Sequence, residues 1–138
     1  MHSKRLGTLG ELKVATYLCG LGLSVFLELG DISKKDLIVE HEGKLLGVQV
    51  KAITKTDGVY RFKASKSGPN YKFDYTEEDC DIFALYCVDD DAIAWLRSSE
   101  VTGENKYVSL RAEETKNNQT EGVRWLKDYT DVNRVLGR

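Results

Sequence analysis

Asp36, Gln49 and Lys51 offer a carboxylate, an amide and an ammonium group within one short segment, DLIVEHEGKLLGVQVK. Carboxylate and amide oxygens can ligate a hard divalent cation such as Mg²⁺. An ammonium group beside them can stabilise negative charge that develops during a reaction. The alternative is structural, because Asp36 could simply start a strand and Lys51 could be a solvated strand end.

The same segment predicts the β-hairpin that would bring these groups together. Two runs rich in Val, Ile and Leu flank Glu42-Gly43, which is a short-turn signal. Regular pairing across this turn places Asp36 directly opposite Gln49. Lys51 is then the diagonal neighbour of Asp36 on the same face, and the other face of the hairpin is apolar. The pattern therefore separates a core face from a chemical face.

A fourth candidate, Glu11, precedes the hairpin in the segment GTLGELKVATYLCGLG. The residues three, four and seven positions after Glu11 are apolar, which is the spacing of one helical face. A carboxylate is therefore aligned with an apolar stripe. The alternative is a capping box, in which Thr8 is the helix N-cap and Glu11 reaches back to its amide.

Three features resemble the PD-(D/E)XK nuclease superfamily: a helix with Glu, an Asp at the start of a hairpin, and an x-Lys on the return strand. The phrases GELKVATYLCGLGLSV, DLIVEHEGKLLGVQVKA and DYTEEDCDIFALYC resemble a branch that includes bacterial group I intron-encoded homing endonucleases. Archaeal Holliday junction resolvases share the arrangement more distantly. The likeness spans Thr8 to Val101. It implies one endonuclease domain over residues 1–138 with an α/β (α+β), restriction-endonuclease-like fold, in which helices flank a mixed central β-sheet.

The resemblance also implies a metal-dependent catalytic site. The residues that match the family's catalytic positions are Glu11, Asp36, Gln49 and Lys51. One or two Mg²⁺ ions would be held by Glu11, Asp36, the Gln49 amide and the Val50 carbonyl. Because Mg²⁺ needs only one or two protein carboxylates, Asp36 and Glu11 can suffice.

Two positions depart from the pattern of the superfamily. Lys35 stands where the superfamily has Pro, and Gln49 stands where it has a second acid. Intron-encoded members are similar in carrying Gln at this position. We therefore expect Gln49 to be a variant ligand and the site to be active.

Charge is segregated along the chain, although the net charge is only −2. Basic residues concentrate between Lys51 and Lys72, and seven acidic residues lie between Glu77 and Asp91. The basic stretch predicts a DNA-contacting ribbon at about 55–73, with strands at 59–63 and 71–73. The residues expected to contact DNA are Lys55, Arg61, Lys63, Lys66 and Lys72. The alternative for either charged run is a solvated face.

The rest of the chain predicts a buried strand at 79–88 with a hairpin partner at 92–97, joined by a solvated acidic turn. One helical turn is expected at 98–101, a short strand at 106–110 and a closing helix at 122–135. No apolar run approaches membrane-spanning length, and the N-terminus lacks the apolar core of a signal peptide. Three cysteines without a CxxC spacing argue against a disulfide scaffold or a zinc site. We therefore expect a cytoplasmic protein that does not associate with membranes.

Together these features predict a Mg²⁺-dependent, sequence-specific double-strand DNA endonuclease of the intron-encoded homing type. A chain of 138 residues that cuts both strands needs a second site, so a homodimer or homotetramer is expected. One alternative is a structure-selective Holliday junction resolvase. Another is a catalytically silent module that binds DNA.

Overall fold

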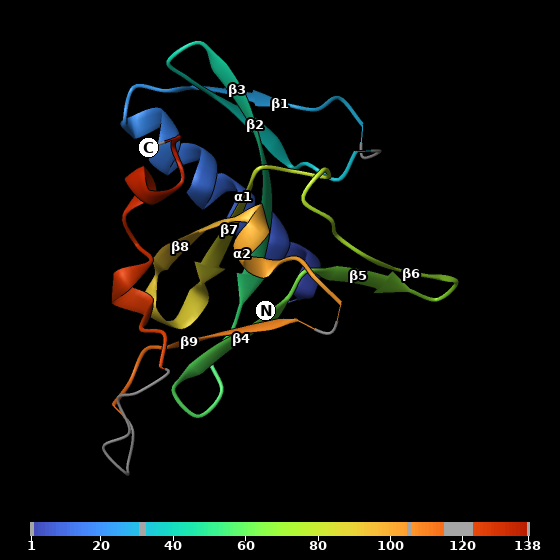
Figure 1. Cartoon of the computed structure of the whole chain (residues 1–138), viewed down its shortest axis with the longest axis vertical. Coiled ribbons are helices and arrows are strands. Elements are labelled where there is room, and N and C mark those ends of the chain that lie inside the picture. Colours follow the sequence, from blue (N-terminus) through green and yellow to red (C-terminus); the bar gives the residue numbers. More distant parts are fainter. Residues whose placement is uncertain (1, 31–32, 105, 115–122, 138) are drawn as a thin grey trace.

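The computed structural model describes residues 2–30, 33–104, 106–114 and 123–137. Its centre is a five-stranded sheet in the order β1-β2-β3-β7-β8, in which β3 and β7 run parallel and the other neighbours antiparallel (Figure 1). These strands are β1 (Ser24–Leu27), β2 (Leu37–His41), β3 (Lys44–Ile53), β7 (Ile82–Cys87) and β8 (Ala92–Arg97). The mixed central sheet that the sequence predicted is confirmed.

β2 and β3 form the predicted hairpin. His41 pairs with Lys44, and the regular pairs continue as far as Leu37. Glu42 and Gly43 have φ values of 50° and 80°, the positive range that both residues of a type I′ turn adopt. The predicted turn and register are therefore confirmed within the hairpin.

Asp36 lies immediately before β2 and departs from this register. Its amide donates a hydrogen bond to the Val48 carbonyl at 2.8 Å, so the predicted pairing of Asp36 with Gln49 is wrong by one residue. β3 continues from here to Ile53, and in the described part of the chain this extension pairs with β7 alone. The edge of β3 beside Asp36 is thus free of a neighbouring strand.

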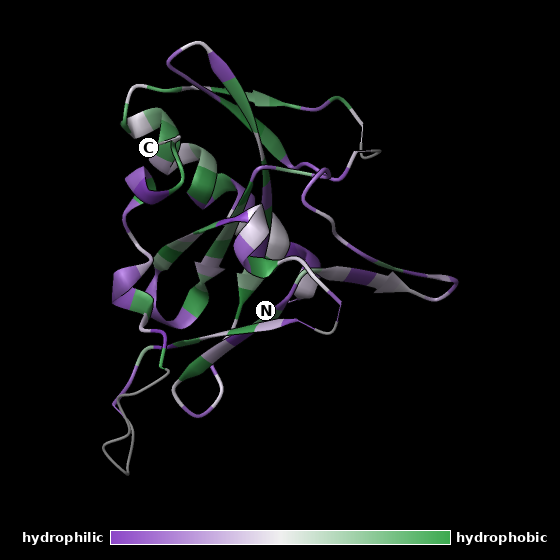
Figure 2. Ribbon diagram, in the orientation of Figure 1, coloured by the Kyte–Doolittle hydropathy of each residue, from purple (hydrophilic) through white to green (hydrophobic). Residues whose placement is uncertain are grey.

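The sheet separates two apolar clusters. Helix α1 (Ser3–Gly20) covers one face, where Val14 and Leu18 are completely buried against the sheet. Strands β4 (Val59–Lys63) and β9 (Tyr107–Arg111) pair with each other and supply buried side chains to the second cluster. Figure 2 shows that the central strands are largely hydrophobic. Side chains alternate along β3, so Val48 and Val50 join the cluster under α1, while Gln49 and Lys51 face the other side of the sheet.

Helix α1 begins earlier than the capping box predicted. His2 is the N-cap, and its Nδ1 accepts a hydrogen bond from the Lys4 amide at 3.2 Å. Thr8 lies inside the helix and donates its hydroxyl to the Lys4 carbonyl at 3.1 Å. The capping box at Thr8 is therefore wrong, because residues 3–6 are ordinary helix formers that extend the helix towards the N-terminus. Glu11 is a mid-helix residue without a capping role.

The basic segment forms two ribbons instead of one. The predicted strand at 59–63 is β4, but its partner is β9. The strand predicted at 71–73 is β6 (Tyr71–Asp74), and it pairs with β5 (Ser65–Gly68). This second hairpin, which we call the arm (residues 65–74), projects from the body of the molecule (Figure 1).

The final part of the chain contradicts the closing helix predicted at 122–135. Gly122 lies outside the described residues, and the segment 123–137 contains the 3₁₀ turns η2 (Leu126–Asp128) and η3 (Val132–Arg134). The Asp131 carboxylate accepts from the Asn133 amide at 2.9 Å, and the Thr130 hydroxyl donates to a backbone carbonyl. Such local bonds from side chains to the backbone compete with a continuous helix.

Several shorter elements agree with the sequence. Strands β7 and β8 pair as predicted, and all six residues of β7 are buried. α2 (Ser98–Val101) is the predicted helical turn, and β9 starts one residue after the predicted position. Among the described residues, no helix is long and apolar enough to cross a membrane.

Candidate active site

Four residues lie where β3 continues past the first residue of β2: Asp36, Gln49, Val50 and Lys51. We call this group the strand fork. The Asp36 carboxylate accepts a hydrogen bond from the Val50 amide through Oδ2 at 2.8 Å. A side chain thus replaces the missing strand partner of β3 and fixes the carboxylate against the strand edge. The other oxygen, Oδ1, has no hydrogen bond within the described residues.

Gln49 and Lys51 point to the face of the sheet opposite α1. Gln49 is 7% exposed, and its Nε2 donates to the Val50 carbonyl at 3.5 Å, a long and weak hydrogen bond. The amide is thus a buried polar group between two apolar residues of β3, Val48 and Val50. Its oxygen is a hard donor of the kind that Mg²⁺ binds.

Lys51 is half-buried at the edge of the same face, and its Nζ lies 5.6 Å from the centre of the Tyr75 ring. Burial lowers the pKa of Lys51 from its ordinary value; the charge of Asp36 opposes this shift, and Lys66 adds to it. Two predicted site residues, Asp36 and Lys51, are therefore electrostatically coupled. Lys66 on the arm is close enough to act on the same ammonium group.

Glu11 reaches this region from the opposite face of the sheet. Glu11 and Asp36 line one cavity of about 240 Å³. Its lining residues are Thr8, Glu11, Leu12, Ala15, Leu27, Glu28, Gly30, Lys35 and Asp36. Asp36 is thus the residue that connects the cavity to the strand fork.

The position of Glu11 depends on Gly10, which is buried between α1 and the sheet. A Cβ atom at this position would lie 3.3 Å from the Ala52 Cβ and 3.5 Å from the Val50 Cγ1. The absence of a side chain lets α1 approach β3 closely. The next residue, Glu11, is consequently held near the strand that carries the fork.

Two lining residues of the cavity were not singled out as site residues. Lys35, which stands where the superfamily has Pro, packs its aliphatic stem over Gly47 of β3. Glu28 adds a third carboxylate to the cavity, but it accepts from the Ser33 amide at 3.1 Å and from the Ser33 hydroxyl. The only sequence signal for Glu28 was an acid inside an apolar run.

The donor set suits a hard divalent cation. Within the described ranges, no three His, Cys, Asp or Glu side chains form a group that could hold a metal ion. Glu11 and Asp36 instead supply two carboxylates to one cavity, and Asp36 is hydrogen-bonded to Val50 of β3, which follows the Gln49 amide. Because Mg²⁺ retains several waters and needs few carboxylates, this oxygen set fits it.

The five residues expected to contact DNA occupy different environments. Lys66 and Lys72 are exposed on the arm, and Arg61 is exposed on β4. Lys63 lies over the Tyr107 ring at 5.3 Å. Lys55 is engaged within the protein, where its Nζ lies 3.3 Å from Asp90 and 3.0 Å from Glu113. Tyr60 and Phe62 pack inward between these basic residues, as predicted.

The acidic turn (Asp89, Asp90 and Asp91) lies far along the chain from the other candidates and is exposed. Its carboxylates are nevertheless paired. Asp89 accepts from the Lys55 amide at 2.7 Å, and Asp90 accepts from the Tyr60 hydroxyl at 2.6 Å. These bonds tie the turn to β4 and to the end of β3.

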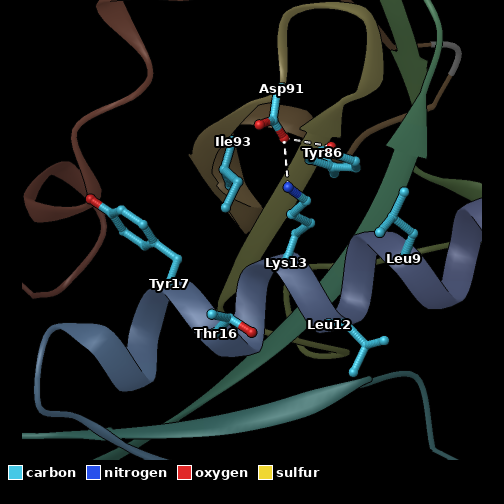
Figure 3. A pocket seen from close by; sticks show the side chains of 8 residues that line it. All are labelled: Leu9, Leu12, Lys13, Thr16, Tyr17, Tyr86, Asp91 and Ile93. Atoms are coloured by element: carbon cyan, nitrogen blue, oxygen red, sulfur yellow. Dashed lines mark hydrogen bonds and ion pairs between the residues drawn. The ribbon is translucent and has the colours of Figure 1, made fainter.

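Asp91 has two partners of its own, as Figure 3 shows. It accepts from the Tyr86 hydroxyl at 2.6 Å, and Lys13 of α1 lies 3.1 Å away. These contacts border a cavity of about 490 Å³ that is otherwise lined mainly by apolar side chains of α1 and by Ile93. The hydrogen bond from Tyr86 and the charge of Lys13 hold the pKa of Asp91 below its usual value.

Comparisons with known proteins identify the family and the fold. A family model described as PD-(D/E)XK endonuclease matches residues 1–132. The solved structure of a bacterial homing endonuclease, I-Ssp6803I, aligns with a TM-score of 0.76 and 18% sequence identity, covering 94% of this chain and 88% of that chain. No curated protein matches the chain. The structural likeness establishes the restriction-endonuclease-like fold, and the family match shows that this chain is a nuclease that belongs to the PD-(D/E)XK endonuclease family.

Proposed function

We propose that the protein is a Mg²⁺-dependent, sequence-specific endonuclease that cuts both strands of DNA, of the homing type. The observation that carries the proposal is the position of Asp36. It lines one cavity with Glu11 and is hydrogen-bonded to Val50, between Gln49 and Lys51. The structural neighbour is described as a bacterial homing endonuclease, which supports the homing type.

Glu11, Asp36, the Gln49 amide oxygen and the Val50 carbonyl would hold the metal. When bound, Mg²⁺ lowers the pKa of a coordinated water and neutralises charge that builds on the scissile phosphate. The protein's own contribution is to fix the oxygen donors. Asp36 is anchored to the backbone of β3, and Glu11 is anchored by the close packing of α1.

Lys51 contributes a positive charge on the face of the sheet opposite α1. A half-buried ammonium group interacts more strongly with a phosphate than a solvated one does, because less water screens it. Lys51 therefore orients the attacking water or stabilises the transition state. While protonated, it cannot act as the general base.

Basic residues on the arm and on β4 would hold the DNA backbone near the fork. The proposed contacts are Lys55, Arg61, Lys63, Lys66 and Lys72. Lys66 is the proposed contact whose charge acts on Lys51. The ion pairs of Lys55 with Asp90 and Glu113 mean that this residue must exchange partners to reach DNA.

Cutting both strands requires two such sites, so we propose a homodimer or homotetramer that acts on DNA in the cytoplasm. A symmetric assembly reads a target with related half-sites. Residues 1–138 then act as one catalytic domain within each subunit.

The decisive test is Mg²⁺-dependent cleavage of a randomised duplex library and of a synthetic four-way junction. Lys51→Ala and a chelator serve as controls. We expect cutting confined to a long duplex consensus, and loss of cutting in both controls. Symmetric cutting of the junction without base preference would instead make the protein a resolvase. Binding of DNA without any nick would make it a silent binding module.

A further inference from the structure

Tyr75 lies beside the strand fork without belonging to the predicted catalytic set. Lys51 Nζ is 5.6 Å from the centre of its ring. Tyr75 is only 3% exposed, and its ring packs edge-on against Phe83 at 5.4 Å and against Phe73 at 5.2 Å. Two aromatic neighbours thus fix the orientation of the ring that Lys51 contacts.

Tyr75 also closes the arm. Its amide donates to the Ala64 carbonyl at 2.9 Å, so the two ends of the arm meet at this residue. Phe73, on the last strand of the arm, lies under a second lysine, because Lys34 Nζ is 4.5 Å from its ring centre. Aromatic residues at the base of the arm therefore contact two lysines, Lys34 and Lys51.

We propose that Tyr75 is a positioning residue for Lys51: its ring holds the ammonium group at the strand fork and ties it to the base of the arm. The proposal rests on the catalytic role proposed for Lys51.

Physical chemistry supports this role. A cation within about 6 Å of an aromatic face is attracted by the ring's electron distribution, most strongly where water is scarce. The lysine stem has four carbons and many rotamers, so a fixed contact removes much of its freedom. Small misplacements of a catalytic group lower the rate by large factors. We therefore expect the Tyr75 ring to affect the chemical step more than DNA binding.

The first test measures the contact without activity. In the metal-free, full-length protein, NMR should show a nuclear Overhauser contact between the Lys51 ε-protons and the Tyr75 ring, and an upfield ring-current shift of those protons. Tyr75→Phe should preserve both signals. Absence of the contact in the wild-type protein would overturn the proposal.

The second test separates rate from binding. We expect Tyr75→Leu to lower kcat by about 10- to 100-fold while KM stays within about threefold. Tyr75→Phe should keep kcat within about threefold, because the ring remains. The matched control is Tyr17→Leu, which removes a tyrosine ring from α1 that packs on Trp95 away from the fork, and should leave kcat unchanged.

Equal losses in Tyr75→Phe and Tyr75→Leu would assign the effect to the hydroxyl and overturn the proposal, as would full activity in Tyr75→Leu. If Tyr75→Leu does not fold, the NMR experiment on the wild-type protein still tests the proposal. Presence of the contact supports it, and absence overturns it. A fully active Lys51→Ala variant would instead refute the catalytic role of Lys51. The NMR contact in the wild-type protein would then still be observed.

Discussion

The acidic turn, which follows β7, and the strand fork, which lies along β3, use their carboxylates differently. At the acidic turn, tyrosine hydroxyls, lysines and a backbone amide of the protein pair with all three aspartates. At the fork, Asp36 is bound through one oxygen to a backbone amide and lines a cavity together with Glu11. The comparison teaches that carboxylates clustered in the sequence can be fully engaged within the protein, whereas a single aspartate can line a cavity.

The largest expected difference between these regions concerns cleavage. Asp36→Asn retains an oxygen that can accept from Val50, so its unfolding midpoint should change little. The loss of negative charge should nevertheless lower cleavage by about 1,000-fold or more. Asp90→Asn is the matched control at the acidic turn, and it should cut normally when folded. Comparable cleavage by both variants under saturating Mg²⁺ would refute the assignment of the fork.

The next effect concerns stability. Tyr60→Phe removes the hydroxyl that donates to Asp90 at 2.6 Å, while the buried ring remains. Because hydrogen bonds to charged groups are stronger than neutral ones, unfolding free energy should fall by about 1.5–3 kcal/mol. Urea denaturation measures this change. The cleavage rate of the folded variant should match the wild type, and a parallel loss of activity would show that the acidic turn also serves the chemistry.

Gln49→Glu sharpens the comparison by adding a carboxylate to the fork. The metal-free variant should be less stable, because position 49 is only 7% exposed and a buried charge is unfavourable. Mg²⁺ should restore stability and should reach half-saturation at about tenfold lower concentration. Thermal unfolding with and without Mg²⁺ measures both effects. Cleavage should persist, and loss of both metal binding and cleavage would contradict the role proposed for Gln49.

The smallest effect is the pH dependence of stability. The Tyr60 hydrogen bond, and then Lys55, hold the pKa of Asp90 below its usual value. A depressed pKa contributes stability above the pKa of the unfolded chain, and this contribution disappears as pH falls through the folded value. Denaturation between about pH 6 and pH 3 should therefore show a shallower decline for Asp90→Asn than for the wild type. Identical slopes would mean that the pairing of Asp90 is energetically neutral.

The parts of the fold that the sequence predicted depend on local patterns. The β2–β3 hairpin follows from a turn at Glu42-Gly43 and from alternation on either side, both of which lie within a few residues. β7 and β8 follow from an apolar run and a short acidic turn. In each case the interactions that define the element connect neighbours in the chain, so a local pattern contains the necessary information.

The parts that were missed depend on distant partners or on competing side-chain bonds. β4 pairs with β9, where Val59 meets Arg111, and no local pattern in the basic segment indicates that partner. In the same way, the one-residue departure at Asp36 depends on hydrogen bonds with β3. The predicted closing helix failed because Asp131 and Thr130 bond to nearby backbone groups.

The candidate site was predicted only in part from the sequence. Family resemblance predicted Glu11, Asp36, Gln49 and Lys51 as site residues. In the structure, Asp36 lines a cavity with Glu11, and its charge acts on Lys51. Tyr75 could not be found in this way, because its contact with Lys51 depends on how the arm returns to the body. An aromatic residue in a basic segment is, by itself, an ordinary core residue.

The hydrogen bond that closes the base of the arm has a consequence for how such proteins diversify. Residues 65–74 leave at Ala64 and return at Tyr75, which are joined by a backbone hydrogen bond. An insertion whose ends coincide can change in length and sequence at little cost to the rest of the fold. Under the proposed function, exchange of the arm would change the DNA target while Asp36, Gln49 and Lys51 stay the same. Tyr75 marks the boundary of the segment.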